Sequence, residues 1–531
     1  MIVEPKLNEL PSSYADRLGL IYTSEVTTEH KKKLGQFFTP LLVAKFMAGF
    51  CLVKKERIKL LDPGFGLGIL SCALIEHLIE KYSEIKEIEL VAFETDDRII
   101  SYATTSLEYL DNWLQNKKIK LIKFLCKNDF ILHNSIVLND SIISTECYDI
   151  IIANPPYFKL KKTDARALAA KSIIYGQTNI YCIFLVISSK LLEKDGQLIF
   201  ITPRSFSSGS YFKVFREKFF SIVDITNIHL FNSRKDAFVR DKILQENIIV
   251  IAKRKNEDTF HQLQLSFTHG GLDEIMISSS EGIKDASIAL AKNYRFRDLV
   301  NLNSEQKILH IPATEKDDKA IKLFKSWKNT LNSYKMEIST GPVVNFRSTK
   351  FIADSYKKNC VPMIYLHNVE KMKFSWSSKH KVRGKSKGHY IIFNDESASR
   401  LVCNKDYILL RRFSSKDDKS RLVASPYFSK YLNQFEMIGI ENHLNYIYRP
   451  SDILTAEEII GIAAILNSKL FDVYFRTFNG NINVSSTELR EMPLPRLKDI
   501  KDIGSRIIKE NKQDQEFIDS IIQKKFGVDL N

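Results

Sequence analysis

The strongest constraint on the fold is a regular alternation of short apolar runs with longer amphipathic stretches. The intervals "GILSCALIEHLIEKY", "DRIISYATTSLEYLDNWL" and "NIYCIFLVISSKLLEKD" carry apolar residues at helical spacing. This alternation predicts a doubly wound α/β sheet. The last two runs lie too close together for a crossover helix, so we expect a final hairpin with one antiparallel strand. The predicted strands are 58–62, 88–94, 119–125, 149–153, 196–202, 226–231 and 246–252.

The alternation ends near residue 257, and the rest of the chain has a different pattern. Its 531 residues are enough for two or three domains. Short strands, basic loops and a long helical stretch at 456–478 predict a C-terminal α+β domain. We expect a polar, partly helical arm (1–30), the sheet domain (31–257), a connecting region with a helix near 316–333 (258–335) and the C-terminal domain (336–531).

Composition narrows the function classes. With 44% hydrophobic residues the chain can bury large cores, which excludes disorder as its main state. A formal charge of +15 favours a polyanionic partner, most simply nucleic acid, although ribosome-associated and membrane-surface proteins share this balance. The seven cysteines show no C-x-x-C spacing, so we expect neither a disulfide framework nor a metal site. No signal peptide and no membrane span is evident, and we expect a cytoplasmic protein.

Polar residues follow the first three predicted strands. "LLDPGFGLGIL" places Asp62, Gly64 and Gly66 between a strand and a helix, where glycines allow a ligand to approach the backbone. In a doubly wound sheet, Glu94 at the end of the next strand reaches the ribose of a nucleoside bound at that loop. Asp129 and Phe130 follow the third strand and can hold an adenine. A structural glycine turn and simple helix caps are the alternatives.

The fourth predicted strand ends in "NPPY", a rigid corner. An amine conjugated to a heteroaromatic ring is a poor nucleophile because its lone pair is delocalised. Carbonyl groups of Asn154 and Pro155 that accept its two protons would favour a pyramidal nitrogen. Pro156 completes the rigid pair, and Tyr157 offers a ring on which a flat base can stack. An ordinary Pro-Pro turn is the alternative.

Asp62-Pro63-x-x-Gly66 followed by the corner 154–157 resembles the S-adenosylmethionine-dependent DNA methyltransferases that make N6-methyladenine. "KKKLGQFFTP" (31–40) precedes the glycine loop and the additional domain follows the sheet, which is similar to the gamma-type order of TaqI-like enzymes. "NPPYFKL", "GQTNIYCIFL", "GQLIFITPRSF" and "KILQENIIVI" resemble the PstI/BsuBI and Eco57I modification enzymes. The resemblance is strong over 31–255 and loose beyond. It implies a Rossmann-like methyltransferase sheet and a C-terminal target-recognition domain.

The resemblance also implies roles for individual residues. The methionine end of the cofactor would contact Phe37, Thr39 and Pro40. The rest of the cofactor would contact Asp62, Gly64, Gly66, Glu94, Asp129 and Phe130. The target adenine would be held by Asn154, Pro155, Pro156 and Tyr157. A second aromatic for its other face would be Phe238, with Phe231 as the alternative.

Basic clusters predict where DNA binds. Arg234, Lys235 and Arg240 surround Phe238, although a solvated charged loop is an equal alternative. Residues 371–390 contain no acid and interleave cations with aromatic residues, as nucleic-acid surfaces do. The cations chosen from the C-terminal domain are Lys379, Lys381, Arg383, Lys385, Arg411 and Arg412.

The sequence thus predicts a site-specific adenine-N6 methyltransferase that flips its target base out of double-stranded DNA. We expect a monomer that forms the modification half of a restriction–modification pair, with the cognate endonuclease on a separate chain. The PstI-like segments suggest a palindromic hexamer such as CTGCAG as the first site to test. Methylation of RNA or of a protein glutamine stays open, as does a catalytically dead DNA-binding specificity protein.

Overall fold

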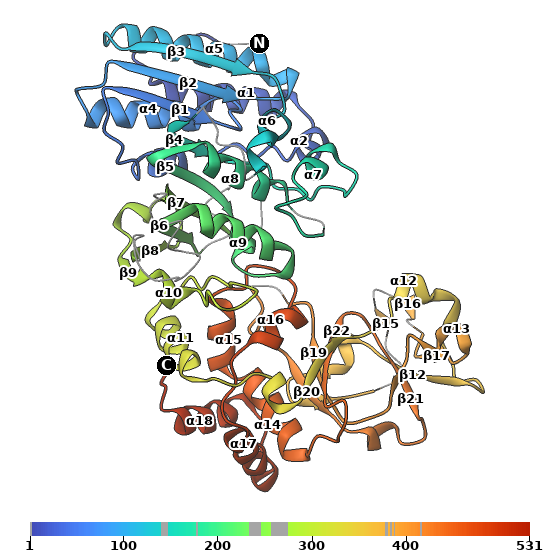
Figure 1. Cartoon of the computed structure of the whole chain (residues 1–531). Helices are drawn as coiled ribbons and strands as arrows, with labels where there is room; N and C mark the ends of the chain where they lie inside the picture. Colours follow the sequence, from blue (N-terminus) through green and yellow to red (C-terminus); the bar gives the residue numbers. More distant parts are fainter. Residues whose placement is uncertain are drawn as a thin grey trace. The chain divides into compact units, whose positions relative to one another are not determined.

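The computed structural model describes residues 3–139, 147–176, 179–232, 246–255, 274–376, 381–382, 385–386, 388–414 and 417–530. The chain forms two compact units, Met1–Ala313 and Thr314–Asn531. We call them the N-terminal unit and the C-terminal unit; they run from blue to green-yellow and from yellow to red in Figure 1. Across the described ranges, no helix combines the length and the apolar character needed to cross a membrane.

A nine-stranded sheet of order β3-β2-β1-β4-β5-β7-β6-β8-β9 forms the centre of the N-terminal unit. All seven predicted runs form strands in it. Strands β1 to β5 are parallel neighbours, and β7 runs antiparallel to both β5 and β6, which confirms the predicted hairpin. The bounds are Arg57–Asp62 (β1), Glu87–Phe93 (β2), Lys120–Cys126 (β3), Tyr148–Ala153 (β4), Leu192–Pro203 (β5), Val223–Phe231 (β6), Asn247–Arg254 (β7), Glu274–Ser280 (β8) and Ala291–Arg295 (β9).

Two hydrophobic cores cover the two faces of this sheet. Successive residues of β4 alternate between them, because strand side chains point to opposite faces. Ile150 and Ile152 join helices α3, α4 and α5, whereas Ile151 and Ala153 join α6, α8 and α9. The α-helices described in the unit after its N-terminal arm are α3 (Leu41–Ala48), α4 (Ile69–Lys81), α5 (Asp97–Gln115), α6 (Phe130–Asn134), α7 (Ala165–Ala169), α8 (Ile180–Leu191), α9 (Lys213–Ile222) and α10 (Phe296–Leu299).

The N-terminal arm is partly helical, as predicted, with α1 (Pro11–Glu25) and α2 (Thr28–Leu34). Tyr14, Leu18 and Tyr22 of α1 are buried in a cluster with Leu67 and with residues of α5. The arm is therefore packed onto the sheet domain. At the other end of the unit, β8 and β9 continue the sheet through the region that the sequence predicts as a connection.

The C-terminal unit contains two larger sheets of orders β10-β22-β19-β20 and β11-β17-β12-β21-β18. Together with its helices they give the predicted α+β architecture. The strands are β10 (Glu337–Thr340), β11 (Ile352–Ala353), β12 (Cys360–Ile364), β13 (Val369–Glu370), β14 (Lys373–Phe374), β15 (Lys381–Val382), β16 (Lys385–Ser386), β17 (Tyr390–Ile392), β18 (Val402–Cys403), β19 (Tyr407–Arg411), β20 (Ala424–Tyr427), β21 (Met437–Ile440) and β22 (Leu444–Tyr448).

The helical stretch predicted at 456–478 is two helices. Ser468 ends the first with extended backbone, and its side chain accepts a hydrogen bond from the Phe471 N–H and so caps the second. The helices of the unit are α11 (Glu315–Ser326), α12 (Asn345–Ser348), α13 (Asp395–Ala398), α14 (Ala456–Asn467), α15 (Lys469–Arg476), α16 (Ser486–Glu491), α17 (Leu497–Glu510) and α18 (Gln515–Phe526).

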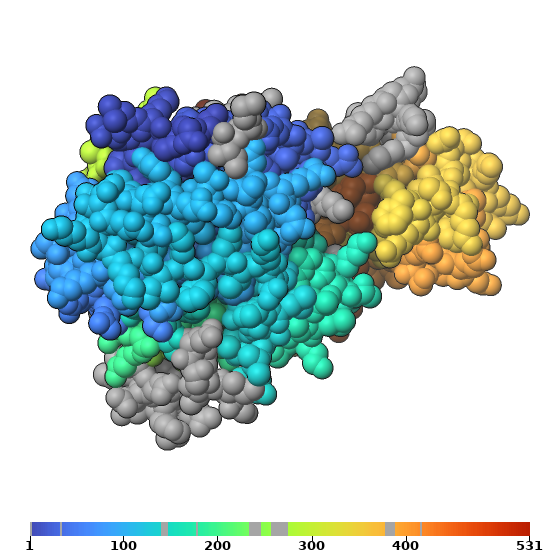
Figure 2. All heavy atoms as spheres, turned by 90° about the horizontal axis from the view of Figure 1, so that it is seen from above, coloured from blue at the N-terminus to red at the C-terminus, as the bar shows by residue number. Residues whose placement is uncertain are grey.

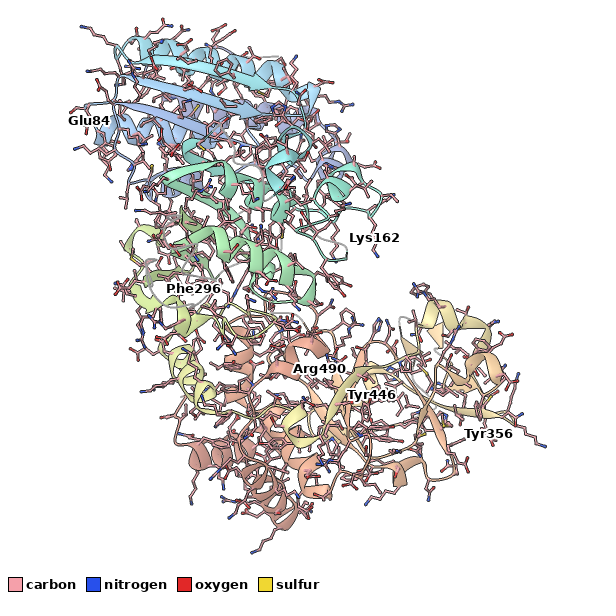
Figure 3. All side chains as sticks on the ribbon, in the orientation of Figure 1. Glu84, Lys162, Phe296, Tyr356, Tyr446 and Arg490 are labelled. Atoms are coloured by element: carbon pink, nitrogen blue, oxygen red, sulfur yellow. The ribbon has the colours of Figure 1, made fainter. Side chains whose placement is uncertain are left out.

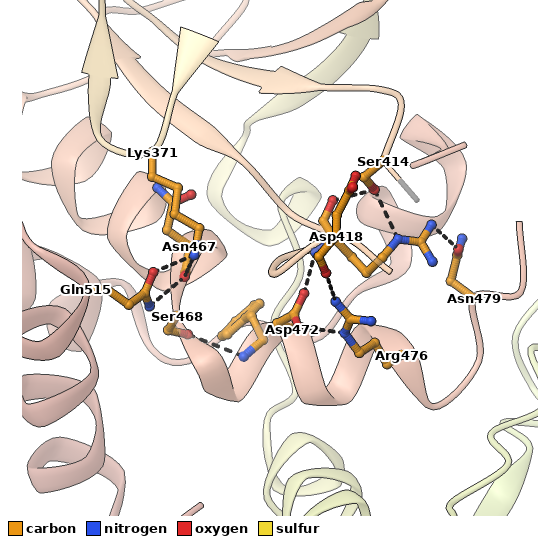
Figure 4. Close-up of polar contacts among 11 residues, drawn as sticks. Lys371, Ser414, Asp418, Asn467, Ser468, Asp472, Arg476, Asn479 and Gln515 are labelled. Carbon is orange, nitrogen blue, oxygen red and sulfur yellow. Dashed lines mark hydrogen bonds and ion pairs between the residues drawn. The ribbon is translucent and has the colours of Figure 1, made fainter. Parts of the chain in front are cut away.

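Buried amides connect these helices to the sheet. The Asn467 side chain donates to the Ala424 carbonyl at 2.7 Å and accepts from the Ala424 N–H at 2.9 Å. The Asn467 carbonyl accepts from Gln515 of α18, and Asp472 of α15 accepts from the Arg421 N–H (Figure 4). The side chain of Asn467 thus pairs with both backbone groups of Ala424 on β20, and the Ala424 carbonyl also accepts from the Met372 N–H at 2.9 Å.

Helices α14 and α17 pack closely through two glycines. A Cβ atom on Gly461 would lie 2.2 Å from the Ile500 carbonyl oxygen, and one on Gly504 would lie 2.0 Å from the Glu457 carbonyl oxygen. Both contacts are far inside van der Waals range. The helix backbones can approach this closely only because neither position has a side chain.

We predict that Gly504→Ala destabilises the C-terminal unit. At an open helical site this change stabilises by about 0.5–1 kcal/mol; here the added methyl group forces the helices apart and should cost about 1–3 kcal/mol. Urea denaturation gives the free energy of unfolding. The control is Ser505→Ala, an exposed position of the same helix, which should be neutral or slightly stabilising. Stabilisation by Gly504→Ala would contradict the packing.

Candidate active site at the carboxyl edge of the sheet

A cleft lies where strands β1 to β4 end. Seven of the predicted site residues line it: Phe37, Gly64, Glu94, Asp129, Phe130, Asn154 and Pro156. The other lining residues are Leu34, Gly35, Gln36, Phe38, Pro63, Phe93, Thr95, Phe158, Arg166, Ile180 and Phe184. Four loops that are distant in sequence therefore meet at one edge, as parallel strands require.

The loop after β1 is held from behind by Asp62. Its carboxylate is fully buried and accepts from the Ser71 hydroxyl at 2.7 Å and from the Gly64 N–H at 3.2 Å. Burial raises the pKa of Asp62 to about 7. Gly66 and Gly68 have φ of +56° and +80°, a conformation that other residues rarely adopt. Asp62 thus shapes the loop, while Gly64 faces the cleft.

Glu94 at the end of β2 faces the cleft and is oriented by three backbone donors. One carboxylate oxygen accepts from the N–H groups of Thr95 and Asp96, both at 2.8 Å, and the other accepts from the Gly66 N–H at 3.0 Å. Burial nevertheless raises the pKa of Glu94. The carboxylate is therefore fixed to the glycine loop and has little rotational freedom.

Asp129 and Phe130 lie after β3. Oδ1 of Asp129 accepts from the Leu132 N–H and caps α6, so the helix-cap alternative describes part of its role. Oδ2 of Asp129 lies 3.7 Å from Nη1 of Arg166, a cleft residue that the sequence did not indicate. The Phe130 ring packs edge-on against Phe93, with centroids 5.3 Å apart.

Asn154 connects two segments that are more than a hundred residues apart. Its Nδ2 donates to the Phe37 carbonyl at 2.8 Å and to the Thr39 hydroxyl at 2.9 Å. Because both amide protons are used within the protein, Oδ1 is the group that this side chain retains as an acceptor. Thr39 is buried and supports the corner through this hydrogen bond, whereas Pro40 precedes α3; neither residue lines the cleft.

Tyr157 lies behind this amide. Its hydroxyl is 2.5 Å from Asn154 Oδ1 and 2.9 Å from the Ile201 carbonyl oxygen, and it carries one proton for the two acceptors. The side chain is 7% exposed and lies nearly parallel to Phe37, at 18° with centroids 6.3 Å apart. Burial raises the pKa of Tyr157, which keeps the hydroxyl protonated. Pro155 is buried beside it.

A second polar cluster holds the 35–40 segment in place. The Asp96 carboxylate accepts from Gln36 Nε2 at 2.7 Å, from the Tyr22 hydroxyl at 2.7 Å, and lies 2.9 Å from His30 Nε2. Burial opposes ionisation of Asp96, but these three donors outweigh it and keep its pKa below the usual range. Sequence reasoning missed this cluster, because its members come from α1, α2, a loop and a strand end.

Several predicted nucleic-acid residues fall outside the described part of the chain: Arg234, Lys235, Phe238, Arg240, Lys379 and Arg383, with the side chains of Lys381 and Lys385. Phe231 is buried in β6. Arg411 and Arg412 are half-buried, and each donates to a backbone carbonyl, of Val369 at 2.6 Å and of Asn442 at 3.1 Å.

Comparisons with known proteins agree with this geometry. The family described as Eco57I restriction-modification methylase matches residues 73–238. The type II methyltransferase M.BsuBI of Bacillus subtilis is 30% identical over 488 residues, which span 90% of this chain and 91% of the relative. M.PstI of Providencia stuartii is 29% identical and the match spans 90% of each chain.

A likeness to a solved structure supports the fold alone. The type IIL restriction-modification enzyme MmeI in complex with DNA matches with a TM-score of 0.52 and 13% identity, over 97% of this chain and 74% of that chain. The identity to M.BsuBI over nearly the full length of both chains is the stronger finding. On that finding, this chain belongs to the Eco57I-type family of type II restriction–modification DNA methyltransferases that contains M.BsuBI and M.PstI.

Proposed function

We propose that this methyltransferase modifies N6 of adenine in duplex DNA, with S-adenosylmethionine as the methyl donor. The orientation of Asn154 carries the proposal. Both of its amide protons are held by Phe37 and Thr39, so Oδ1, which already accepts from the Tyr157 hydroxyl, is the side-chain atom left to accept a proton from a substrate amine. An exocyclic amine needs such an acceptor, with the Pro155 carbonyl as the second.

The cleft residues fit S-adenosylmethionine. Glu94 offers a fixed carboxylate for a ribose diol, and Asp129 beside Phe130 offers an acceptor and a ring for an adenine. Phe37 and Gly64 border the side nearest Asn154 and would contact the methionine end. When bound, the cofactor supplies an electrophilic methyl group.

The protein's part in the chemistry is positioning and polarisation. Two carbonyl acceptors on the amine protons pull the nitrogen out of conjugation with the ring and expose its lone pair. Neither Asp62 nor Glu94 has to act as a base, because the proton on the methylated nitrogen can leave to water. Asn154, which is already oriented, needs no rearrangement in the transition state.

The target adenine must leave the DNA stack to reach Asn154, at a cost of a few kcal/mol. We propose that Tyr157 and Phe238 take its two faces; because Tyr157 is 7% exposed, its packing has to open when the base enters. Residues 336–531 would recognise the DNA sequence. The proposed DNA contacts are Arg234, Lys235, Arg240, Lys379, Lys381, Arg383, Lys385, Arg411 and Arg412.

We further propose a cytoplasmic monomer that protects DNA from a separate endonuclease. Transfer of tritium from labelled S-adenosylmethionine to duplex DNA, RNA and protein tests the substrate class. Long-read sequencing of DNA from expressing cells gives the modified base and its site, with CTGCAG as the first expectation. Label in RNA or protein but not in DNA would refute the proposal.

We predict that Asn154→Ala lowers the rate of methyl transfer by about 10²–10³-fold, the range for loss of one oriented group in a transition state. Cofactor affinity should change much less, and calorimetry measures it separately. Asn116→Ala, an exposed position at the end of α5, is the control and should transfer tritium normally. Near-normal methyl transfer by Asn154→Ala would contradict the proposed role of Asn154.

We predict that Glu94→Gln weakens S-adenosylmethionine binding by about 10–100-fold, the equivalent of one charge-assisted hydrogen bond. A glutamine amide has one acceptor oxygen and cannot serve three backbone donors and a ribose together. Calorimetry gives the Kd. Glu89→Gln, in the same strand but outside the cleft, should bind like wild type. An unchanged Kd for Glu94→Gln would contradict a role for Glu94 in binding the cofactor ribose.

We predict that Tyr157→Phe keeps most activity, because it preserves the buried ring and removes only the hydroxyl that contacts Asn154. Tyr157→Ala should lose methyl transfer and destabilise the N-terminal unit by about 3–5 kcal/mol through a cavity. Activity assays and thermal melts measure the two effects. Equal activities of the Phe and Ala variants would contradict a role for the ring.

A further inference from the structure

A basic and aromatic surface lies beside the Asn154 corner. It belongs to the segment that follows β4 and to the loop that follows β5. Tyr175 and Tyr211 are 60% and 51% exposed. Lys162 of this surface is labelled in Figure 3. We name it the lysine–tyrosine face, and it consists of Lys159, Lys161, Lys162, Lys171, Tyr175 and Tyr211, all exposed.

The charge of this face is not balanced locally. Between residues 155 and 176 the sequence contains one acid, Asp164. Arg166 occupies it with two hydrogen bonds, from Nε at 2.9 Å and from Nη2 at 2.7 Å. Within the described residues, no ion pair joins the four lysines to a carboxylate. Four exposed lysines on one short segment, without an ion pair to a described carboxylate, suit a polyanion.

The ring of Tyr211 is packed against the backbone and against a lysine. Gly176, with φ of +69°, packs its backbone against Tyr211 so closely that a Cβ would lie 2.8 Å from the ring. Lys159 Nζ is 6.0 Å from the ring centroid, within cation–π range. A ring that is fixed on the surface and still half exposed can receive a ligand with little loss of entropy.

Packed aromatic rings connect the face to the active site. Phe212, next to Tyr211, stacks on Tyr181 with centroids 6.0 Å apart, and Tyr181 contacts the Tyr157 ring edge-on at 6.2 Å. Lys159 is two residues beyond Tyr157, and its backbone forms an isolated antiparallel β-bridge with Asn179. The same loops thus carry the corner that would hold the target base and the exposed cations.

We propose that the lysine–tyrosine face binds the phosphodiester backbone of the DNA strand that carries the target base. The inference rests on the proposed function and adds a surface for its substrate. Lysine ammonium groups neutralise phosphates without reading sequence, so they set the position of the strand. The tyrosine rings would pack against a sugar or an unstacked base next to the extruded one.

The first experiment replaces the lysine pair Lys161→Ala/Lys162→Ala in the full chain. Fluorescence anisotropy with a labelled random-sequence duplex, without cofactor, measures Kd over a salt series. The variant should bind at least about tenfold more weakly. The slope of log Kobs against log salt is negative, and it should become less negative by about 2, because each lost phosphate contact contributes ~0.9. The Kd for S-adenosylmethionine should stay at the wild-type value.

Lys117→Ala/Lys118→Ala is the matched control. These two lysines are also adjacent and exposed, but they precede β3 at the opposite edge of the sheet. Their loss should leave the DNA affinity and the salt slope at wild-type values. If both double variants behave like wild type, or if both weaken binding equally, the proposed face is wrong.

A second pair of variants tests the ring. Tyr211→Ala should weaken duplex binding several-fold. Tyr211→Phe keeps the ring and should bind the duplex like wild type. Equal binding by Tyr211→Ala and wild type would contradict a contact between the Tyr211 ring and the DNA. These assays measure binding without methylation. If the chain binds DNA through this face but methylates no adenine, the proposed function is wrong and the face is not. If the double lysine variant is active and keeps the wild-type salt slope, the face is wrong and the proposed function is not.

Discussion

The active-site region depends on how one amide is held. Asn154 uses both of its protons on the Phe37 carbonyl and the Thr39 hydroxyl, and so joins the end of β4 to the segment before α3. The amide cannot turn over without losing two buried hydrogen bonds, each of which is costly to leave unmade. The Oδ1 acceptor is therefore fixed in place before any ligand arrives, which is the preorganisation that enzymes use in place of solvent.

Acidic residues hold the loops around that amide. Asp62 supports the glycine loop, Glu94 accepts three backbone N–H groups, and Asp129 caps α6. Glu94 and Asp129 also border the cleft, so each of these two carboxylates both fixes a loop and lines the cleft. Asp96 does not line the cleft, but it holds the N-terminal arm through Tyr22, His30 and Gln36. The shape of the site and its charge thus come from the same side chains.

Most of the sheet could be predicted from the sequence, because burial on both faces leaves continuous apolar runs such as 149–153. The motifs also located the residues that meet at its edge. The Asp96 cluster could not be predicted, since its partners are brought together only by packing of α1 on the sheet. Arg166 gave no periodic or motif signal. The break at Ser468 was missed because apolar spacing continues through it and only the cap stops the helix.

The Tyr157 hydroxyl has a further consequence. It lies within hydrogen-bonding distance of Asn154 Oδ1 and of the Ile201 carbonyl. A rotation of the O–H bond toward Ile201 would release a lone pair on Oδ1 and still leave the buried proton bonded. Asn154 Oδ1 can thus replace the Tyr157 hydroxyl with an incoming amine as its donor, and the Tyr157 proton keeps an acceptor throughout. A phenol behind the Asn154 amide lets the resting site keep all of these hydrogen bonds and still free an acceptor when a donor arrives.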